Sequence, residues 1–203
     1  MITLHFATTN KNKIVELQRI VSNILTHKIT VKPLECSIVE PEENGKTFYE
    51  NSEIKFMHYE RYYGNQADGS FVIAEDSGFE IPDLNNFPSV NSSRFLKQFK
   101  TNKEAFLVIK DMLSKIFQEP LQKHIKARFV CDICARINNK LLHFTSNVNG
   151  FISFQFINDE GFGYDPIFIP ENYTKTFAQM SGTEKDIISH RGKAFQQFLS
   201  FIL

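Results

Sequence analysis

Residues 2–25 read ITLHFATTNKNKIVELQRIVSNIL, and this stretch decides the fold class. Its first part, Ile2–Ala7, is a short apolar run that predicts a strand, and the polar residues 8–12 predict a loop. A helix should follow, because apolar residues then recur at the 3.6-residue spacing of a helix that packs on a sheet. Strand, loop and helix in this order begin a βαβ unit and indicate an α/β protein. The apolar positions of this helix are Ile14, Leu17, Val21, Ile24 and Leu25.

The rest of the chain continues this alternation and then adds an antiparallel part. Thr47 and Glu50 can form a capping box that starts a helix, and Asn102 can cap a later one. The turn residues 138–140 should join two strands in a hairpin, whereas prolines should keep residues 81–95 irregular. We therefore expect a mixed α/β sheet, flanked by helices and elongated by the hairpin region. The expected strands are 29–34, 71–75, 127–137, 141–148 and 150–157, and the expected helices are about 47–63, 103–117 and from 189 onward.

Composition limits the classes of protein that remain. The 203 residues contain 23 Lys plus Arg and 23 Asp plus Glu, so the chain lacks the basic excess of a general nucleic-acid binder. No run approaches the ~20 apolar residues of a membrane span. The N-terminus lacks the basic and then apolar layout of a signal peptide, which favours a soluble cytoplasmic protein.

The three cysteines, an odd number, fit a reducing compartment better than a complete disulfide framework. Cys131 and Cys134 have CxxC spacing, which in other contexts marks a redox or zinc site. They fall inside the expected strand 127–137, where residues three apart point to opposite faces of a sheet. We therefore expect both thiols to pack in the core.

An acidic pair, Glu75-Asp76, follows the apolar run Phe71–Ala74 and precedes Ser77-Gly78. In open α/β sheets ligands bind outside the carboxyl ends of strands, where a carboxylate can hold a divalent cation or deprotonate a water molecule. The alternative is an ordinary acidic turn, because Asp, Ser and Gly are common turn residues. Taken by themselves, these residues leave both interpretations open.

Other segments can bind phosphate. Residues 8–13 lie at the predicted junction of the first strand and helix, where free N–H groups and the helix dipole favour an anion. Alternatively, Asn10 caps the helix and the lysines are solvated. Lys55 shares a helix face with Asn51, and Glu42 lies in an acidic loop, but each is equally an ordinary surface residue. The loop residues are Thr8, Thr9, Asn10, Lys11, Asn12 and Lys13.

Two segments nearer the C-terminus have the composition of a nucleobase pocket. Residues 161–166 combine two glycines, two aromatic rings that can stack on a base, and the carboxylate of Asp165. Arg191 can donate two parallel hydrogen bonds to a keto oxygen and a ring nitrogen, as guanidinium does toward guanine. The alternatives are a tight turn ended by Pro166, and a helix capped by Ser189 and followed by exposed basic residues.

Taken together and in this order, these segments resemble the inosine triphosphate pyrophosphatase family, which removes non-standard purine triphosphates. The resemblance covers almost the whole chain and implies a single domain over residues 1–203, with two lobes and a central cleft. This sequence departs from the family at Thr9, where a glycine is usual, and at 85–89, which keep Pro88 but lack the common glycines. The matching segments are Ala7–Asn10 with Lys13, Gly45–Phe48 with Glu50, Asn51 and Lys55, Ala74–Gly78, Gly161–Phe168, and Lys185 with Ser189–Arg191.

The resemblance implies a homodimer that hydrolyses the α–β phosphoanhydride bond of ITP, dITP and XTP with Mg²⁺, giving the monophosphate and pyrophosphate. It assigns Asp76 as general base and metal ligand, Glu42 and Glu75 as further metal ligands, and Ser77 as a nucleotide contact. It assigns two further sets. The triphosphate ligands would be Thr8, Thr9, Asn10, Lys11, Asn12, Lys13, Lys55 and Lys185, and the base pocket would be Phe162, Gly163, Tyr164, Asp165, His190 and Arg191.

Two rival functions are compatible with these residues. A Maf-like pyrophosphatase for pyrimidine or modified nucleotides would use similar chemistry, although the segment Ser189-His190-Arg191 favours a purine. A nucleotide-binding protein that senses without turnover would leave the carboxylates without a catalytic role. It would bind nucleotide and release no product.

Overall fold

The opening βαβ unit forms as its sequence predicts, and it sets the direction of the central sheet. In the computed structural model, β1 (Ile2–Ala7), α1 (Lys11–Ile24) and β2 (Ile29–Pro33) follow one another, and β1 pairs in parallel with β2. The strand β3 (Ser70–Ile81) pairs in parallel with the other side of β1. The structure describes residues 2–24, 29–33, 38–63, 69–117, 125–156 and 162–203, so Leu25, Leu34, Ile157 and Gly161, all assigned above from the sequence, lie outside the described residues.

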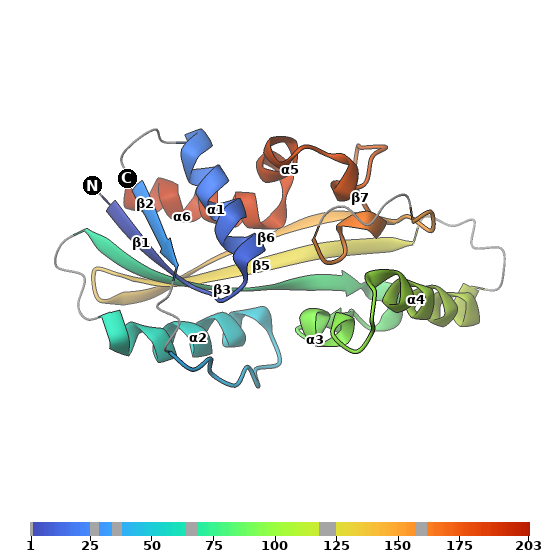
Figure 1. Ribbon diagram of the computed structural model, residues 1–203, viewed down its shortest axis with the longest axis horizontal. Helices are drawn as coiled ribbons and strands as arrows, with labels where there is room; N and C mark the ends of the chain where they lie inside the picture. Colours follow the sequence, from blue (N-terminus) through green and yellow to red (C-terminus); the bar gives the residue numbers. More distant parts are fainter. Residues whose placement is uncertain (1, 25–28, 34–37, 64–68, 118–124, 157–161) are drawn as a thin grey trace.

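An antiparallel half extends this sheet. The strand β5 (Lys126–Ile137) pairs with β3 and with β6 (Lys140–Ile152), and β7 (Phe168–Pro170) pairs with the end of β6. The strand order is β2-β1-β3-β5-β6-β7, and the short β4 (Phe87–Ser89) pairs with β3 outside this order. Figure 1 shows a long, twisted sheet that runs through the whole molecule. The expected elongated mixed sheet is therefore confirmed.

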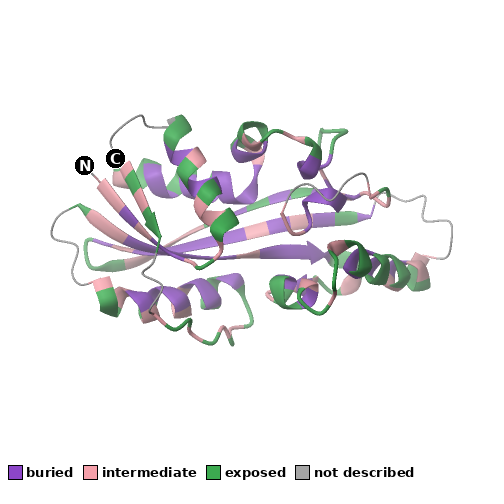
Figure 2. Cartoon of the chain, viewed as in Figure 1, coloured by how far each residue is buried: buried purple, intermediate pink, exposed green. Residues whose placement is uncertain are grey.

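Helices cover both faces of the sheet (Figure 1). The helices α1, α5 (Gly182–Ile188) and α6 (His190–Ile202) lie on one face, and α2 (Phe48–Tyr63), α3 (Ser92–Leu96) and α4 (Asn102–Phe117) lie on the other. In Figure 2 the middle strands β3 and β5 and the inner faces of the helices are largely buried, whereas the edge strand β2 is not. No helix in the described ranges has both the length and the apolar character that crossing a bilayer requires. Short 3₁₀ turns occur at Pro82–Leu84, Asp165–Ile167 and Phe177–Gln179.

Side-chain caps fix where two helices that border the site begin. The hydroxyl of Thr47 accepts a hydrogen bond from the Glu50 N–H at 3.1 Å, and the Glu50 carboxylate accepts one from the Thr47 N–H at 3.1 Å. This confirms the predicted capping box of α2. At the start of α6, the Ser189 hydroxyl accepts from the N–H of Gly192 at 3.0 Å. Both caps satisfy backbone donors that the first helical turn would otherwise leave free.

The cap of α4 differs from the prediction. The Thr101 hydroxyl, rather than the side chain of Asn102, accepts a hydrogen bond from the N–H of Glu104, at 3.3 Å. The assignment of Asn102 as the cap was therefore wrong by one residue. The Asn102 amide instead donates to the carbonyl of Gly163 at 3.5 Å, which connects α4 to the segment around residue 163.

Two other segments also differ from the expectation. Residues 81–95 are not irregular, because they contain a 3₁₀ turn, β4 and α3. Residues 150–152 continue β6 instead of starting a new strand. Gly150 allows this strand to run on beside β7, since a Cβ at that position would come within 2.2 Å of the Ile169 carbonyl oxygen.

β3 is longer than the sequence predicts. The expected end lies near Glu75, with a turn at Ser77-Gly78, but the strand continues to Ile81. Gly78 is a packing residue here, because a Cβ built on it would lie 2.6 Å from the Ser89 carbonyl oxygen and 2.6 Å from the Ser92 hydroxyl. The glycine lets the segments that carry β4 and α3 approach β3 closely. The acidic pair therefore lies inside a long strand.

Substituting Gly78 by alanine is expected to lower the free energy of unfolding by about 1–3 kcal/mol, the usual range for overpacking. The added methyl group would push against the backbone of Ser89, which cannot move without disturbing β4. Urea unfolding followed by circular dichroism measures this change. An unfolding midpoint equal to that of the wild type would contradict the close approach described above.

Phenylalanine supplies much of the core. Phe79, Phe129 and Phe168 pack against one another edge to face, with ring centroids 5.0–5.9 Å apart. Cys131 and Cys134 are both fully buried, and they belong to different apolar clusters on opposite faces of β5. The expectation that this CxxC pair packs in the core is confirmed.

Candidate active site

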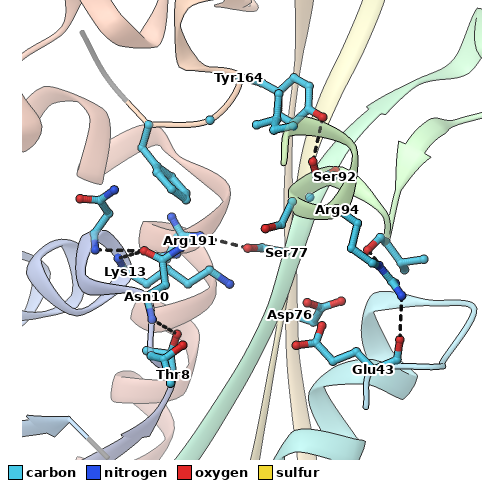
Figure 3. Close-up of a pocket in the computed structure, with 18 of the residues that line it drawn as sticks. Thr8, Asn10, Lys13, Glu43, Asp76, Ser77, Ser92, Arg94, Tyr164 and Arg191 are labelled. Carbon is cyan, nitrogen blue, oxygen red and sulfur yellow. Dashed lines mark hydrogen bonds between the residues drawn. The ribbon is translucent and has the colours of Figure 1, made fainter. Parts of the chain in front are cut away.

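A pocket of about 780 Å³ opens beside the place where β1 ends. Ala7 pairs with Ala74, so β1 stops one residue before the level of Glu75. The acidic pair thus lies at the carboxyl end of the parallel part of the sheet, although its own strand continues. The pocket walls come from the β1–α1 loop, the segment before α2, α2, β3, α3, residues 162–165, α5 and α6. Figure 3 shows side chains from several of these walls facing one another.

Loop 8–13 forms one wall of this pocket. Asn10 caps α1, because its Oδ1 accepts hydrogen bonds from the N–H groups of Asn12 at 3.0 Å and Lys13 at 3.4 Å. Lys11, by contrast, is exposed at the start of α1 and does not line the pocket. Its assignment as a substrate ligand therefore has no support in this geometry. The loop residues that line the pocket are Thr8, Thr9, Asn10, Asn12 and Lys13.

Asp76 is 5% exposed and lines the pocket, and α2 holds its carboxylate in place. Lys55 Nζ donates to Asp76 Oδ1 at 2.9 Å, and Asn51 Nδ2 donates to Asp76 Oδ2 at 3.2 Å. The two donors are four residues apart on one helix face, as their spacing predicts. Burial raises the pKa of Asp76, and the nearby Lys55 ammonium offsets this only in part. A carboxylate with a raised pKa in a pocket is suited to proton abstraction.

Glu75 faces the opposite side of the sheet and has different partners. Arg191 donates from Nε and Nη2 to the two oxygens of Glu75, at 2.8 and 2.9 Å, and Lys13 Nζ lies 3.0 Å from Oε1. The Ser77 hydroxyl also donates to Oε1, at 2.8 Å. Burial alone would raise the pKa of Glu75, but Arg191 and Lys13 outweigh it and hold that pKa well below its usual range. The Glu75 carboxylate thus favours its charged form and contacts two cations, Arg191 and Lys13.

The three expected metal ligands, Glu42, Glu75 and Asp76, do not come together. Glu42 is exposed, and neither Glu42 nor Glu75 lines the pocket. Glu43 does, and its Oε1 lies 3.3 Å from Lys55 Nζ, the same ammonium that contacts Asp76 (Figure 3). Within the described ranges, no three His, Cys, Asp or Glu side chains are arranged as a metal site. The pocket therefore offers two neighbouring carboxylates, Glu43 and Asp76.

Of the two aromatic rings expected to stack on a base, one is engaged in the core. Tyr164 is 3% exposed and stacks on Phe79 with ring centroids 4.7 Å apart, while its hydroxyl donates to a carbonyl of α3. Phe162 is partly exposed and lines the pocket. Gly163 has φ +63°, a left-handed conformation that favours glycine, and Asp165 closes this turn by accepting from the Phe162 N–H at 2.9 Å. The ring of Phe162 is the one left facing the pocket.

Lys185 lies with the base-pocket residues rather than with loop 8–13. Its Nζ is 2.6 Å from Asp165 Oδ2 and 2.8 Å from Glu16 Oε1, and it is 6% exposed. Arg191 also donates to Glu16, through Nη1. The assignment of Lys185 to the triphosphate stays a prediction: its ammonium lines the pocket and is held by the carboxylate that closes the 162–165 turn.

His190 and Arg191 are both almost completely buried. The His190 ring stacks on Phe129 with centroids 4.6 Å apart, and its Nδ1 is buried without a hydrogen-bond partner. Burial, together with Arg191 and Lys185, lowers the pKa of His190 well below its usual range, so the imidazole is neutral. Two parallel donors of Arg191, Nε and Nη2, already pair with Glu75.

Three residues of this pocket region were missed from the sequence. Glu43 is adjacent to the chosen Glu42, and loops lack the periodicity that would select one of them. Glu16 joins Lys185 and Arg191 from α1, but its partners lie 169 and 175 residues away in the sequence. Arg94 lies in the segment that was expected to be irregular and lines the pocket from α3. No local pattern could reveal the last two.

The chain has a mixed α/β fold with a polar loop after the first strand and a buried carboxylate on β3, and the family and relatives it matches make it a nucleoside triphosphate pyrophosphatase. Within this class, the chain belongs to the Ham1 family, whose sequence profile matches residues 4–201. This match confirms the resemblance to the inosine triphosphate pyrophosphatases.

Relatives match along nearly their whole length. A dITP/XTP pyrophosphatase of Malacoplasma penetrans is 37% identical over 97% of this chain and 96% of its own. A dITP/XTP pyrophosphatase of Methylacidiphilum infernorum is 33% identical over 97% and 92%. Among solved structures, a HAM1 protein from Coxiella burnetii has a TM-score of 0.80 at 32% identity, covering 100% of this chain and 98% of that one. The Staphylococcus aureus Ham1 protein has a TM-score of 0.77 at 30% identity, covering 98% and 97%.

Proposed function

We propose that this chain hydrolyses the non-standard purine triphosphates ITP, dITP and XTP to the monophosphate and pyrophosphate, with Mg²⁺. The observation that carries the proposal is the group formed by Asp76, Lys55 and Glu43, which lines the same pocket as loop 8–13 and the segment 162–165. The pocket thus combines a base, a phosphate-binding loop and a nucleobase wall. The printed activity of the full-length relatives, dITP/XTP pyrophosphatase, supports the same substrate class.

Asp76 is the general base of the proposed reaction. Lys55 and Asn51 each donate to one of its oxygens, which fixes the plane of the carboxylate and leaves acceptor capacity on both oxygens. A water molecule that hydrogen-bonds to this carboxylate loses its proton to Asp76 as its oxygen attacks phosphorus. The raised pKa of Asp76 brings its basicity closer to that needed near neutral pH.

The residues present fit a magnesium ion. Mg²⁺ is commonly held by one or two carboxylates together with water and substrate phosphates, and Glu43 and Asp76 supply two carboxylates around one ammonium. Their mutual repulsion contributes to the raised pKa of Asp76, and a cation between them would relieve it. Mg²⁺ held there would neutralise phosphate charge and make a nearby water molecule more acidic.

Loop 8–13 binds the phosphates in this proposal. Thr8, Asn10 and Lys13 line the pocket beside Ser77, and the loop lies at the N-terminus of α1, where backbone amides favour anions. Thr9 also lines the pocket and donates to Glu40, so its hydroxyl is held within the loop network. The substrate therefore extends from loop 8–13 toward the segment 162–165.

The base pocket recognises the 6-keto group of a purine. Phe162 offers an aromatic ring, and the neutral His190 has a buried ring nitrogen without a partner, which costs free energy until a ligand group satisfies it. Lys185 and Arg191 line the same region and hold Asp165 and Glu75 in place. Adenine presents an amino group in place of the keto oxygen, so N–H donors aimed there would be left unpaired, and discrimination follows.

A substrate panel tests this proposal. Initial rates of pyrophosphate release should be highest for ITP, dITP and XTP and at least about tenfold lower for ATP, because one unpaired buried polar group costs about 1–3 kcal/mol. GTP and dUTP complete the panel. A preference for dUTP would favour a Maf-like pyrophosphatase, and tight nucleotide binding without any product would favour a sensor. Either outcome would overturn the proposed function.

Replacing Lys55 by methionine should move the acid limb of the pH profile of kcat/KM to higher pH. A general base is active when deprotonated, so activity falls as the pH drops through the pKa of Asp76. Lys55 lowers that pKa, and without its ammonium the burial of Asp76 raises the pKa further. At neutral pH the rate should fall about tenfold or more. Lys46→Met, on an exposed side chain near the start of α2, is the control and should keep the wild-type profile. An unshifted profile in Lys55→Met would contradict the assignment of Asp76.

We also propose that the protein is a cytoplasmic homodimer that acts without nucleic-acid or membrane partners. Size-exclusion chromatography with multi-angle light scattering should give about twice the chain mass of 23.5 kDa. A single-chain mass at micromolar concentration would contradict the homodimer.

A further inference from the structure

Most of the positive charge around the pocket is already neutralised by the protein's own carboxylates. Four cations that the sequence analysis assigned to the substrate each lie within 3.0 Å of an acidic oxygen. A triphosphate carries several negative charges, and binding it requires positive charge that is not committed elsewhere. The four pairs are Lys13 with Glu75 (3.0 Å), Lys55 with Asp76 (2.9 Å), Lys185 with Asp165 (2.6 Å) and Arg191 with Glu75 (2.8 Å).

Arg94 and Lys97 differ from these four. Arg94 lies in α3, Lys97 follows its end, and both are exposed residues that line the pocket. Among the ion pairs formed within the described part of the chain, none involves Arg94 or Lys97. These two side chains therefore supply the uncommitted positive charge of the pocket wall.

Arg94 is further placed by two backbone carbonyls. Its Nη1 donates to the carbonyl oxygen of Glu43 at 3.2 Å, and its Nη2 donates to that of Val90 at 3.3 Å. These contacts use two of the five N–H donors of the guanidinium and leave three. Figure 3 shows Arg94 beside Glu43, across the pocket from Lys13. The guanidinium is thus held next to Glu43. The carboxylate of Glu43 contacts the Lys55 ammonium, and the same ammonium contacts Asp76.

We propose that Arg94 binds the pyrophosphate part of the substrate and is a further catalytic residue of the proposed reaction, on which this inference rests. In that reaction the water oxygen bonds to the α-phosphorus, and Asp76 takes the water proton. The bond from the α-phosphorus to the α–β bridging oxygen breaks, and pyrophosphate leaves with the electron pair. Negative charge grows on this leaving group, and a guanidinium that donates paired hydrogen bonds to its oxygens stabilises the transition state.

Two features favour Arg94 over Lys97 for this role. Arg94 is fixed beside Glu43 by the carbonyl contact, whereas no hydrogen bond of Lys97 reaches that loop within the described residues. A guanidinium also presents several donors in a rigid plane, which matches phosphate oxygens better than an ammonium does.

The contact with Glu43 raises a competing explanation, in which Arg94 only holds the loop that carries this residue. The experiment must therefore distinguish binding of pyrophosphate by the positive charge of Arg94 from the hydrogen bond by which Arg94 holds the Glu43 loop.

Titration calorimetry with inorganic pyrophosphate and Mg²⁺ provides this separation. We would compare the wild type with Arg94→Ala, Arg94→Gln and Arg94→Lys. Glutamine keeps N–H donors but has no charge, whereas lysine keeps the positive charge but lacks the planar set of donors of a guanidinium. The matched control is Arg61→Ala. Arg61 is an exposed residue of α2 that does not line the pocket, and its side chain donates to the Met57 carbonyl of its own helix. Melting temperatures of all variants show whether each is folded.

Pyrophosphate should bind about tenfold to a hundredfold more weakly to Arg94→Ala and Arg94→Gln, as expected for a lost hydrogen bond to a charged group. Arg94→Lys should bind pyrophosphate more tightly than Arg94→Gln and less tightly than the wild type, because it keeps the charge but loses the paired donors. Arg61→Ala should match the wild type, and inosine monophosphate should bind all variants equally. Wild-type affinity of Arg94→Ala for pyrophosphate would overturn the proposal. Retained affinity in Arg94→Gln with loss in Arg94→Lys would also overturn it, because tethering would then be the role of Arg94.

The failure of this inference is distinguishable from that of the proposed function. If the wild type releases no pyrophosphate from ITP, the proposed function fails, whereas the titration still decides whether Arg94 binds pyrophosphate. If the wild type does release pyrophosphate and Arg94→Ala still binds it normally, the role of Arg94 alone is wrong.

Discussion

Replacing Asp76 by asparagine should lower kcat for pyrophosphate release from ITP by about a hundredfold to ten-thousandfold, the usual contribution of a positioned base. Asparagine has nearly the same shape and keeps an oxygen that can accept from Lys55, but it cannot take a proton from water. Steady-state kinetics with a coupled pyrophosphate assay measures the change. KM should change less than kcat, because the lost interaction acts mainly in the transition state.

The control for this variant is Asp83→Asn, on an exposed aspartate of a 3₁₀ turn. It should retain wild-type kcat and KM. The melting temperature of Asp76→Asn should not fall, because burial raises the pKa of Asp76 and a neutral side chain costs less to bury than a charged one. Full activity in Asp76→Asn would remove Asp76 from the mechanism. A large fall in melting temperature would mean instead that Asp76 has a mainly structural role.

Replacing Glu43 by glutamine should raise the Mg²⁺ concentration needed for half-maximal activity by about tenfold or more, while Glu42→Gln should leave it unchanged. Glu43 is the carboxylate that shares Lys55 with Asp76, whereas Glu42 is exposed outside the pocket. Changing a group that supports a metal typically costs about 10–100-fold in metal affinity or activity. Magnesium titrations of the initial rate at fixed ITP measure this effect.

The two glutamates are adjacent, so the pair of variants forms a closely matched control. High Mg²⁺ should restore part of the activity of Glu43→Gln, because mass action compensates for weakened binding. If Glu42→Gln showed the raised requirement and Glu43→Gln did not, the original choice of Glu42 would be right and the geometry described above would be wrong. Equal and small effects in both variants would exclude either residue from metal binding.

The sequence predicts the architecture well where periodicity carries the information. One example is the first helix, where the apolar residues from Ile14 to Val21 recur at helical spacing. Another is the hairpin, which the turn residues 138–140 indicate. The capping box of α2 is predicted for the same reason, because it is a contact between the near neighbours Thr47 and Glu50. The expected mixed sheet and its flanking helices followed from these signals, and the division into two lobes stays a prediction.

The errors occur where tertiary packing overrides local chemistry. Ser77-Gly78 reads as a turn, but Gly78 is needed for the approach of β4 and α3, so β3 continues through it. Tyr164 was expected to stack on a base, and the sequence does not indicate that its ring also stacks on Phe79 in the core. Gly150 similarly allows β6 to continue beside β7. In each case the deciding neighbour is distant in the sequence, and no local pattern names it.

The candidate site was predicted in outline, and its details depend on pairing between distant residues. Asn51 and Lys55 share one face of α2 as their spacing predicts, but the contact of both with Asp76 on β3 joins residues 21 and 25 positions apart and was not predicted. The partner of Arg191 is 116 residues away, so the sequence could not show that Glu75 occupies the guanidinium edge. The same holds for Glu16 and for Arg94, whose roles depend on which elements the fold brings to one pocket.

The central claim is that this pocket cleaves the α–β bond of a purine triphosphate, and the products of ITP hydrolysis test it most directly. Purified protein, ITP and Mg²⁺ should yield inosine monophosphate and pyrophosphate in equal amounts from the first turnovers, with no orthophosphate, when the products are separated by ion-exchange chromatography. Formation of inosine diphosphate and orthophosphate would contradict the claim.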